Sequence, residues 1–245
     1  LQRLNAGIFL QHVILTATFF VIPMLLQEQL KLHNLSQQWH FYLPLMMVSF
    51  LLMIPCILYA ERKKQLKRVF ISAVFFTSVA QFFLAFNYSH WIAFCLWMLI
   101  YFIAFNVLEA NLPSLISKHA RTNNKGTAMG VYSSCQFMGI FVGGTLAGIL
   151  FQYAGIRSIF FVNALMSLVW CIIALPMKAN LYFNTVLLPY SKKASPSLVM
   201  ALKTLHGIDN VILAEEEQVI YLRVDTQQYI PGSAEKVLSA YHHNV

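Results

Sequence analysis

Residues Trp91 to Ser117 read WIAFCLWMLIYFIAFNVLEANLPSLIS, and this stretch decides the fold class. A helix rises about 1.5 Å per residue, so roughly 20 apolar residues cross the hydrocarbon of a bilayer, which is about 30 Å thick. The stretch is longer than that and contains a single carboxylate, Glu109. It therefore predicts a transmembrane helix.

Similar apolar stretches occur before and after it. The whole chain is 58% hydrophobic and 11% charged, which is far from the composition of a soluble domain. Alternation of period two, the pattern of a membrane-spanning β-barrel, is absent. We therefore predict an α-helical membrane protein, embedded in lipid, with six transmembrane helices within residues 1–180. The predicted spans are Ala6–Leu26, Phe41–Ala60, Val69–Phe86, Trp91–Ser117, Thr127–Phe151 and Ser158–Met177.

Basic residues gather at one set of predicted helix ends. Twelve of the seventeen Lys and Arg residues lie there, two lie at the opposite ends and three follow in the C-terminal segment. Since loops on the cytoplasmic side carry the excess of Lys and Arg, both termini are predicted to be cytoplasmic. The net charge of +8 follows mostly from this excess, so we predict no nucleic-acid partner.

Motifs of enzymes and metal sites are missing from the sequence. The four cysteines fall in four different apolar spans, without a CxxC, and HExxH, GxSxG and P-loop patterns are absent. We predict no enzymatic activity, no metal and no cofactor. The chain begins at Leu1 without an initiator Met or a signal-peptide pattern, which suggests a fragment or a processed product.

Acidic residues become frequent after Met177, and we predict a small α+β domain over residues 181–245. Alternating residues in the 219–224 stretch predict a strand with one buried face. The predicted order is strand, helix, strand, strand, helix. The ranges are Phe183–Leu188, Ser197–His206, Val211–Ala214, Val219–Val224 and Ser233–Tyr241.

Glu109 is the only formal charge inside the six spans. A carboxylate at the centre of a membrane helix costs about 2.5–3.5 kcal/mol on insertion scales, so it is usually turned inward, partnered or protonated. Helical spacing puts Asn106 on the same face as Glu109, which predicts a polar pair in the bundle interior. Two interpretations stay open: a substrate or proton site, and a structural carboxylate held by a neighbouring helix.

The fifth span, KGTAMGVYSSCQFMGIFVGGTLAGIL from Lys125 to Leu150, is rich in glycine. Small residues four apart let a second helix approach closely in lipid. We predict helix packing at Gly130, Gly139, Gly143, Gly144 and Gly148. Tyr132 and Gln136 place polar groups in the same span and are candidates for lining a cavity.

The loop ERKKQLKR, Glu61 to Arg68, connects the second and third spans. Its basic residues can be explained by the excess of Lys and Arg in cytoplasmic loops alone. A second interpretation is a gate, in which Glu61 and Arg62 form ion pairs with neighbouring helix ends in one conformation only.

Several segments resemble drug/proton antiporters of the major facilitator superfamily. KGTAMG at the start of the glycine-rich span resembles the opening of the eleventh helix of these transporters. LNAGIFLQH, YAERKKQLKRVF and AFNVLEANLPSLISK resemble the matching parts of the YajR subgroup, which carries a small ferredoxin-like domain after its last helix. The resemblance implies that this chain is the C-terminal half of a twelve-helix transporter, with the N-terminal six-helix half as its partner.

The resemblance also implies which residues line the substrate cavity. The first and fourth helices of this half would face it, which places Gln11, His12, Asn106 and Glu109 near substrate and protons. The C-terminal segment resembles heavy-metal-associated domains but has no CxxC, so we predict contacts or dimerisation for it and no metal binding.

Two functions remain open from the sequence. The first is a secondary transporter of the bacterial inner membrane that couples efflux of small organic compounds to protons. The second is a non-transporting protein whose helices anchor a regulatory or interaction domain to the membrane.

Overall fold

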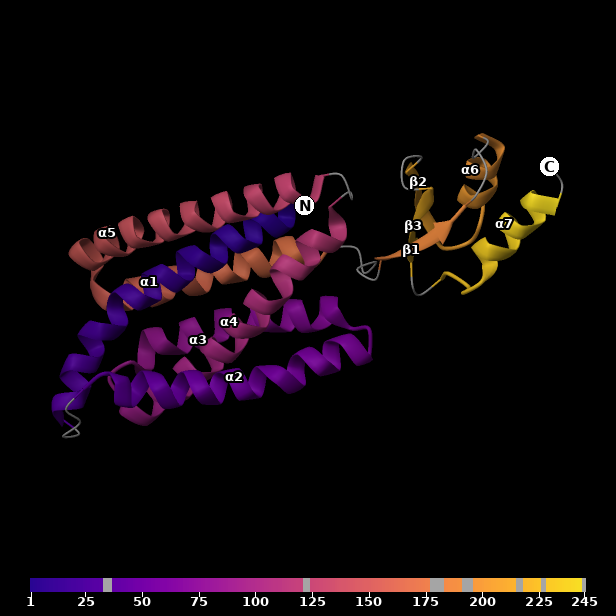
Figure 1. Ribbon diagram of the computed structural model, residues 1–245. Helices are drawn as coiled ribbons and strands as arrows, with labels where there is room; N and C mark the ends of the chain where they lie inside the picture. The colour runs from indigo at the N-terminus through magenta and orange to yellow at the C-terminus, as the bar shows by residue number, and fades with distance from the viewer. Residues whose placement is uncertain are drawn as a thin grey trace. The chain divides into compact units, whose positions relative to one another are not determined.

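A computed structural model describes residues 1–32, 37–120, 124–176, 183–190, 196–214, 218–225 and 228–243. The chain divides into two compact units, Leu1–Ala179 and Asn180–Val245. The first unit is helical, and the second combines strands with helices (Figure 1). This division falls next to the boundary expected at residue 180.

Five helical elements form the first unit, and each is long and apolar enough to cross a membrane. Together with the small sheet of the second unit, they confirm the predicted fold class of a helical membrane protein with an α+β appendage. The helices also extend beyond the predicted apolar spans at most of their ends. The five elements are α1 (Gln2–Leu32), α2 (Trp39–Arg62), α3 (Leu66–Asn87), α4 (Trp91–His119) and α5 (Lys125–Ala174).

The fifth element contains two of the six predicted spans. A straight helix of its 50 residues would be about 75 Å long, more than twice the thickness of the hydrocarbon. Gly155, with φ of 73° and ψ of −175°, breaks it. Such a left-handed φ is tolerated by glycine because it has no Cβ. The fifth and sixth predicted spans are therefore the two halves of α5.

The two halves of α5 run in opposite directions along α1. Gly139 of the first half packs against the Phe9 carbonyl, and a Cβ on Gly7 would lie 3.0 Å from Trp170 Nε1 of the second half. Positions on the two sides of Gly155 thus meet neighbouring turns of α1, which requires a hairpin. Figure 1 shows α1 between the two halves.

The remaining helices form a second layer of contacts. The helix α3 packs against both α4 and α5, and α2 packs against α4. A continuous core of buried side chains runs through α1, α4 and α5 and includes Met98, Phe102 and Phe160. Several outward side chains of α2, among them Met47, Phe50 and Leu51, are more than half exposed. An apolar surface of this kind suits lipid or another apolar protein surface.

The second unit contains a three-stranded antiparallel sheet with strand order β1-β3-β2. Ile220, Leu222 and Val224 of β3 are buried, while the alternating Val219, Tyr221 and Arg223 are partly exposed. The prediction of one buried face is confirmed. The parallel strands β1 and β2 flank β3, which makes a split βαβ arrangement. The elements are β1 (Phe183–Pro189), α6 (Pro196–Lys203), β2 (Ile208–Ala214), β3 (Val219–Asp225) and α7 (Ser233–His243).

Candidate functional site

Two adjacent polar residues on α1, Gln11 and His12, begin the candidate site. Both are about 3% exposed, although they lie in an apolar span. The His12 Nδ1 atom lies 3.1 Å from the carbonyl oxygen of Ile8, one turn earlier. A carbonyl can only accept a hydrogen bond, so we assign the hydrogen of neutral His12 to Nδ1. The Nε2 atom of neutral His12 is then an acceptor that points away from its own helix.

Glu109 reaches this pair from α4. Gln11 Nε2 donates a hydrogen bond of 2.9 Å to Glu109 Oε2. His12 Nε2 lies 4.0 Å from the same oxygen, close enough for an ion pair when the imidazole is protonated. The Glu109 side chain is 37% exposed, so one side of the carboxylate contacts protein and the other is open.

The first half of α5 supplies the third wall of the site. Gln136 Nε2 lies 2.9 Å from His12 Nε2 and donates to it when His12 is neutral. Tyr132, one turn earlier on the same face, is buried. It lies close enough to Glu109 for an electrostatic interaction between the two side chains. Its hydroxyl has no hydrogen-bond partner within the described part of the chain.

The structure therefore gathers five of the six predicted site residues from three helices. Asn106 is the exception. Its Nδ2 donates a hydrogen bond of 3.1 Å to Ser49 Oγ of α2, while Glu109 turns toward α1. The predicted polar pair between Asn106 and Glu109 is wrong. Residues three apart on a helix diverge by about 60° around its axis, which is enough here for the two side chains to reach different neighbours.

Close helix packing brings Gln136 against His12. A Cβ on Gly139 would collide with the Phe9 carbonyl, and a Cβ on Gly143 would come within 2.8 Å of Val13 Cα. The other three glycines of the predicted packing set make no such close contact within the described chain, so packing at Gly130, Gly144 and Gly148 stays a prediction. Apart from its own stretch of helix, no described part of the chain comes within 4 Å of a Cβ on Gly130 or Gly148, and Gly144 makes only an ordinary contact with Thr16. Those three glycines do not face α1 closely, because the face of α5 that contacts α1 is the one that carries Gly139 and Gly143.

The two gating candidates lie apart from this site. Glu61 and Arg62 are exposed at the C-terminal end of α2, where the chain turns into α3. Their ion-pair switch stays a prediction.

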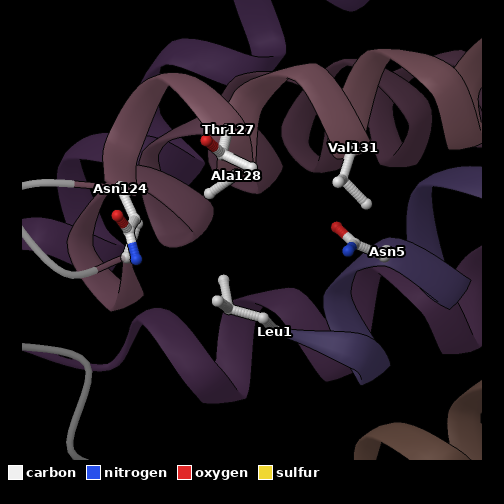
Figure 2. Close-up of a pocket in the computed structure, with 7 residues that line it drawn as sticks. Leu1, Asn5, Asn124, Thr127, Ala128 and Val131 are labelled. Carbon is white, nitrogen blue, oxygen red and sulfur yellow. The ribbon is translucent and has the colours of Figure 1, made fainter.

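A hollow of about 430 Å³ lies between the first turns of α1 and α5 (Figure 2). Asn5, which lines it, is seven residues before His12 and therefore shares its helical face. The Asn5 Oδ1 atom is buried without a hydrogen-bond partner in the described structure. The hollow thus lies on the same α1–α5 interface as His12 and Gln136, about 10 Å along the helix axis.

A buried polar cluster in the bundle was not predicted from the sequence. Gln81 Nε2 of α3 donates a hydrogen bond of 3.0 Å to Thr18 Oγ1 of α1. Asn163 Nδ2 of α5 donates a hydrogen bond of 3.2 Å to the same oxygen. All three residues are at most 1% exposed. Single amides in otherwise apolar spans were the available signal, because such side chains seek partners on other helices.

Comparisons with known proteins agree with this architecture. A family model described as Major Facilitator Superfamily matches residues 4–201. The inner membrane transport protein YajR of Escherichia coli (strain K12) is 34% identical over 229 residues, which are 93% of this chain and 50% of YajR. An uncharacterized transporter of Buchnera aphidicola subsp. Baizongia pistaciae is 33% identical over 174 residues, 70% of this chain and 44% of that protein.

A third relative, uncharacterized transporter BU466 of Buchnera aphidicola subsp. Acyrthosiphon pisum, is 29% identical over 141 residues. Those residues are 58% of this chain and 36% of that protein. The chain thus spans half the length, or less, of the curated relatives described here. The family match covers most of the chain, and the chain therefore belongs to the Major Facilitator Superfamily, a family of transporters and not of enzymes.

Proposed function

We propose that the complete protein is a secondary active transporter that exchanges small organic compounds for protons, with this chain as its second six-helix half. Family membership favours transport over a purely anchoring role. The proposed partner is a first six-helix half, and the coverage of only 50% of YajR by this chain supports that proposal. The name of that relative supports placement in a bacterial inner membrane.

The position of Glu109 carries this proposal. It is the only formal charge in the predicted spans, and it lies where α1, α4 and α5 meet. Ionisable groups inside membranes mark ion and substrate pathways, because an idle charge there would be costly. No Lys or Arg neutralises it within the described residues of the site.

Gln11 can serve both protonation states of Glu109. An amide offers a donating nitrogen and an accepting oxygen on the same group. The nitrogen now donates to Glu109, while the Gln11 Oε1 atom is buried without a partner in the described structure. After protonation, a rotation of the amide would let Oε1 accept from the carboxyl hydrogen. Loading and releasing the proton then needs only this local exchange.

His12 and Gln136 form a second adaptable pair. Neutral His12 accepts from the Gln136 amide at Nε2. A proton on Nε2 would make it a donor, directed either to Glu109 or to a rotated Gln136 whose oxygen accepts. A proton on this ring would allow an ion pair with the carboxylate 4.0 Å away.

Water reaches this site from the basic end of the bundle in our proposal. The hollow beside Asn5 lies on the same interface, and the unpartnered Asn5 Oδ1 and Tyr132 hydroxyl are polar groups that water would satisfy. With both termini cytoplasmic, this route opens to the cytoplasm.

We assign the C-terminal unit a ferredoxin-like fold and a regulatory role, which it exerts through contacts or dimerisation outside the membrane.

The test is transport by the complete protein in proteoliposomes. Ethidium serves as the organic probe and an entrapped pH dye follows protons. Glu109→Gln keeps the hydrogen bond with Gln11 but holds no titratable proton, so it should abolish proton-driven ethidium movement while the protein stays folded. The matched control is Glu235→Gln, in the exposed first turn of α7. Full coupling in Glu109→Gln would remove Glu109 from the mechanism, and no ethidium or proton movement in the unmodified protein would count against drug export.

A further inference from the structure

A second and larger hollow lies between α2, α3 and α4, away from the Glu109 site. Its volume is about 700 Å³, and we call it the α2–α4 groove. The walls are apolar, with Phe76 of α3 and Ile100 and Ile103 of α4. Small side chains at Ala73 and Ala104 leave space between the helices. An apolar groove of this size accommodates an elongated hydrophobic ligand.

Polar groups are concentrated at one end of the groove. Tyr59, Gln65 and Arg68 line it where α2 turns into α3. The Tyr59 hydroxyl donates to Gln65 Oε1 at 3.3 Å, and the Arg68 side chain is exposed. No ion pair to Arg68 is found among the described residues. The same turn belongs to the basic loop ERKKQLKR, so the mouth of the groove is strongly positive.

The groove has the depth of one membrane leaflet. Arg68 at the mouth and Phe76 in the wall are eight residues apart on α3, which corresponds to about 12 Å along the helix. Half of the hydrocarbon thickness is about 15 Å. A molecule with an anionic head at Arg68 and a chain lying against Phe76 and Ile100 would therefore match both ends of the groove.

We propose that the α2–α4 groove binds one anionic phospholipid, with an acyl chain between α3 and α4 and the phosphate at Arg68. Charge complementarity selects this occupant: basic pockets between transmembrane helices bind anionic head groups, and the apolar walls bind the chain. A neutral apolar compound would leave the cationic mouth unused. The inference does not depend on transport, because it uses none of the residues at Glu109.

Cys56 lines the groove and provides a native reporter. The complete protein, with its other cysteines replaced, is reconstituted into phosphatidylcholine nanodiscs with and without phosphatidylglycerol. The rate of Cys56 alkylation by N-ethylmaleimide is then measured. Bound phosphatidylglycerol should slow the reaction relative to phosphatidylcholine alone. Arg68→Gln should raise the phosphatidylglycerol concentration needed for the same protection about fivefold. This is the effect expected from the loss of one basic residue near a membrane surface.

Two further variants make the test specific. Lys63→Gln removes the same charge from the same loop without lining the groove, and it should keep the protection. Ser72→Phe places a ring in the groove from its exposed edge and should abolish the dependence on phosphatidylglycerol. Transport or thermal melting of each variant shows that it is folded.

Several results would overturn the proposal. Equal alkylation rates in both bilayers would mean ordinary boundary lipid. Protection by inorganic phosphate in phosphatidylcholine, or protection that Arg68→Gln leaves unchanged, would mean that no lipid head group is recognised at Arg68. A Cys56 thiol that stays unreactive even in delipidated detergent micelles would mean that another protein segment fills the groove.

Discussion

Gln11 Nε2 lies 2.9 Å from Glu109 Oε2, so a neutral amide makes the hydrogen bond to the one charged residue of the predicted spans. A Lys or Arg at this position would favour the ionised carboxylate permanently. An amide stabilises the carboxylate without fixing its charge, because it can also accept from the protonated form. This choice of partner is what a site that changes protonation state needs.

Gln11→Lys should therefore keep a contact with Glu109 but suppress proton-coupled transport. A hydrogen bond to a charged partner contributes about 1.5–3 kcal/mol, which corresponds to a loss of roughly 10- to 100-fold. Proton flux into proteoliposomes measures the effect. Gln152→Lys, at an exposed position of α5, is the control for an added charge. Unchanged coupling in Gln11→Lys would separate Gln11 from the proton site.

The close approach of α1 and α5 gives a prediction on stability. Even the Cβ of Gly143→Ala would lie 2.5 Å from the Val13 carbonyl oxygen, so the helices must separate. We expect a loss of about 1–3 kcal/mol, as for other overpacked interfaces. Gly148→Ala has open space and should be neutral or slightly stabilising, since alanine is the better helix former. Thermal melting of the solubilised complete protein compares the two, and equal melting temperatures would argue against the interface.

The buried amide cluster should contribute to the stability of the bundle. Gln81→Leu leaves Thr18 and Asn163 without one of their hydrogen bonds. The expected loss is about 1 kcal/mol, because hydrogen bonds between membrane helices average near 0.6 kcal/mol and the stranded groups add to it. Adding Asn163→Leu should cost less than the sum of the two single changes. Strict additivity in thermal melting would show that the residues do not act together.

The predicted strands and the buried face of β3 give a test for the second unit. Leu222 is fully buried, and Leu222→Ala should destabilise this unit by about 2–5 kcal/mol. Leu187→Ala, at a position 58% exposed on β1, is the matched control and should change little. Limited proteolysis of the complete protein monitors the unit, with faster cleavage expected only in Leu222→Ala. Similar cleavage rates in both variants would contradict the sheet.

Much of the fold follows from the sequence because lipid restricts the alternatives. Long apolar spans must satisfy their backbone groups internally, which leaves helices as the consistent choice. The break at Gly155 was also predictable, since residues 152–157 separate two predicted apolar spans. The sheet order was not, because strand pairing depends on contacts between segments that no single stretch determines.

The site was predictable in composition but not in geometry. Polar groups in apolar spans pointed to Glu109, Tyr132 and Gln136, whereas Gln11 and His12 were implied by the family resemblance. The structure brings these five residues together. The direction of each side chain around its helix was not available from spacing alone, which is why Asn106 was paired with Glu109 and not with Ser49. Likewise, glycine spacing predicts packing, but only the neighbouring helix decides that Gly139 and Gly143 face α1.

Carbodiimide labelling of Glu109 tests the central claim most directly. Dicyclohexylcarbodiimide enters apolar sites and reacts with carboxyl groups that carry a proton, and mass spectrometry locates the adduct. In the complete protein, we expect labelling at Glu109 that falls as the pH rises and that changes its pH dependence in His12→Ala. Absence of an adduct at Glu109 across the whole pH range, while proton-coupled transport continues, would contradict Glu109 as the site that loads and releases the proton.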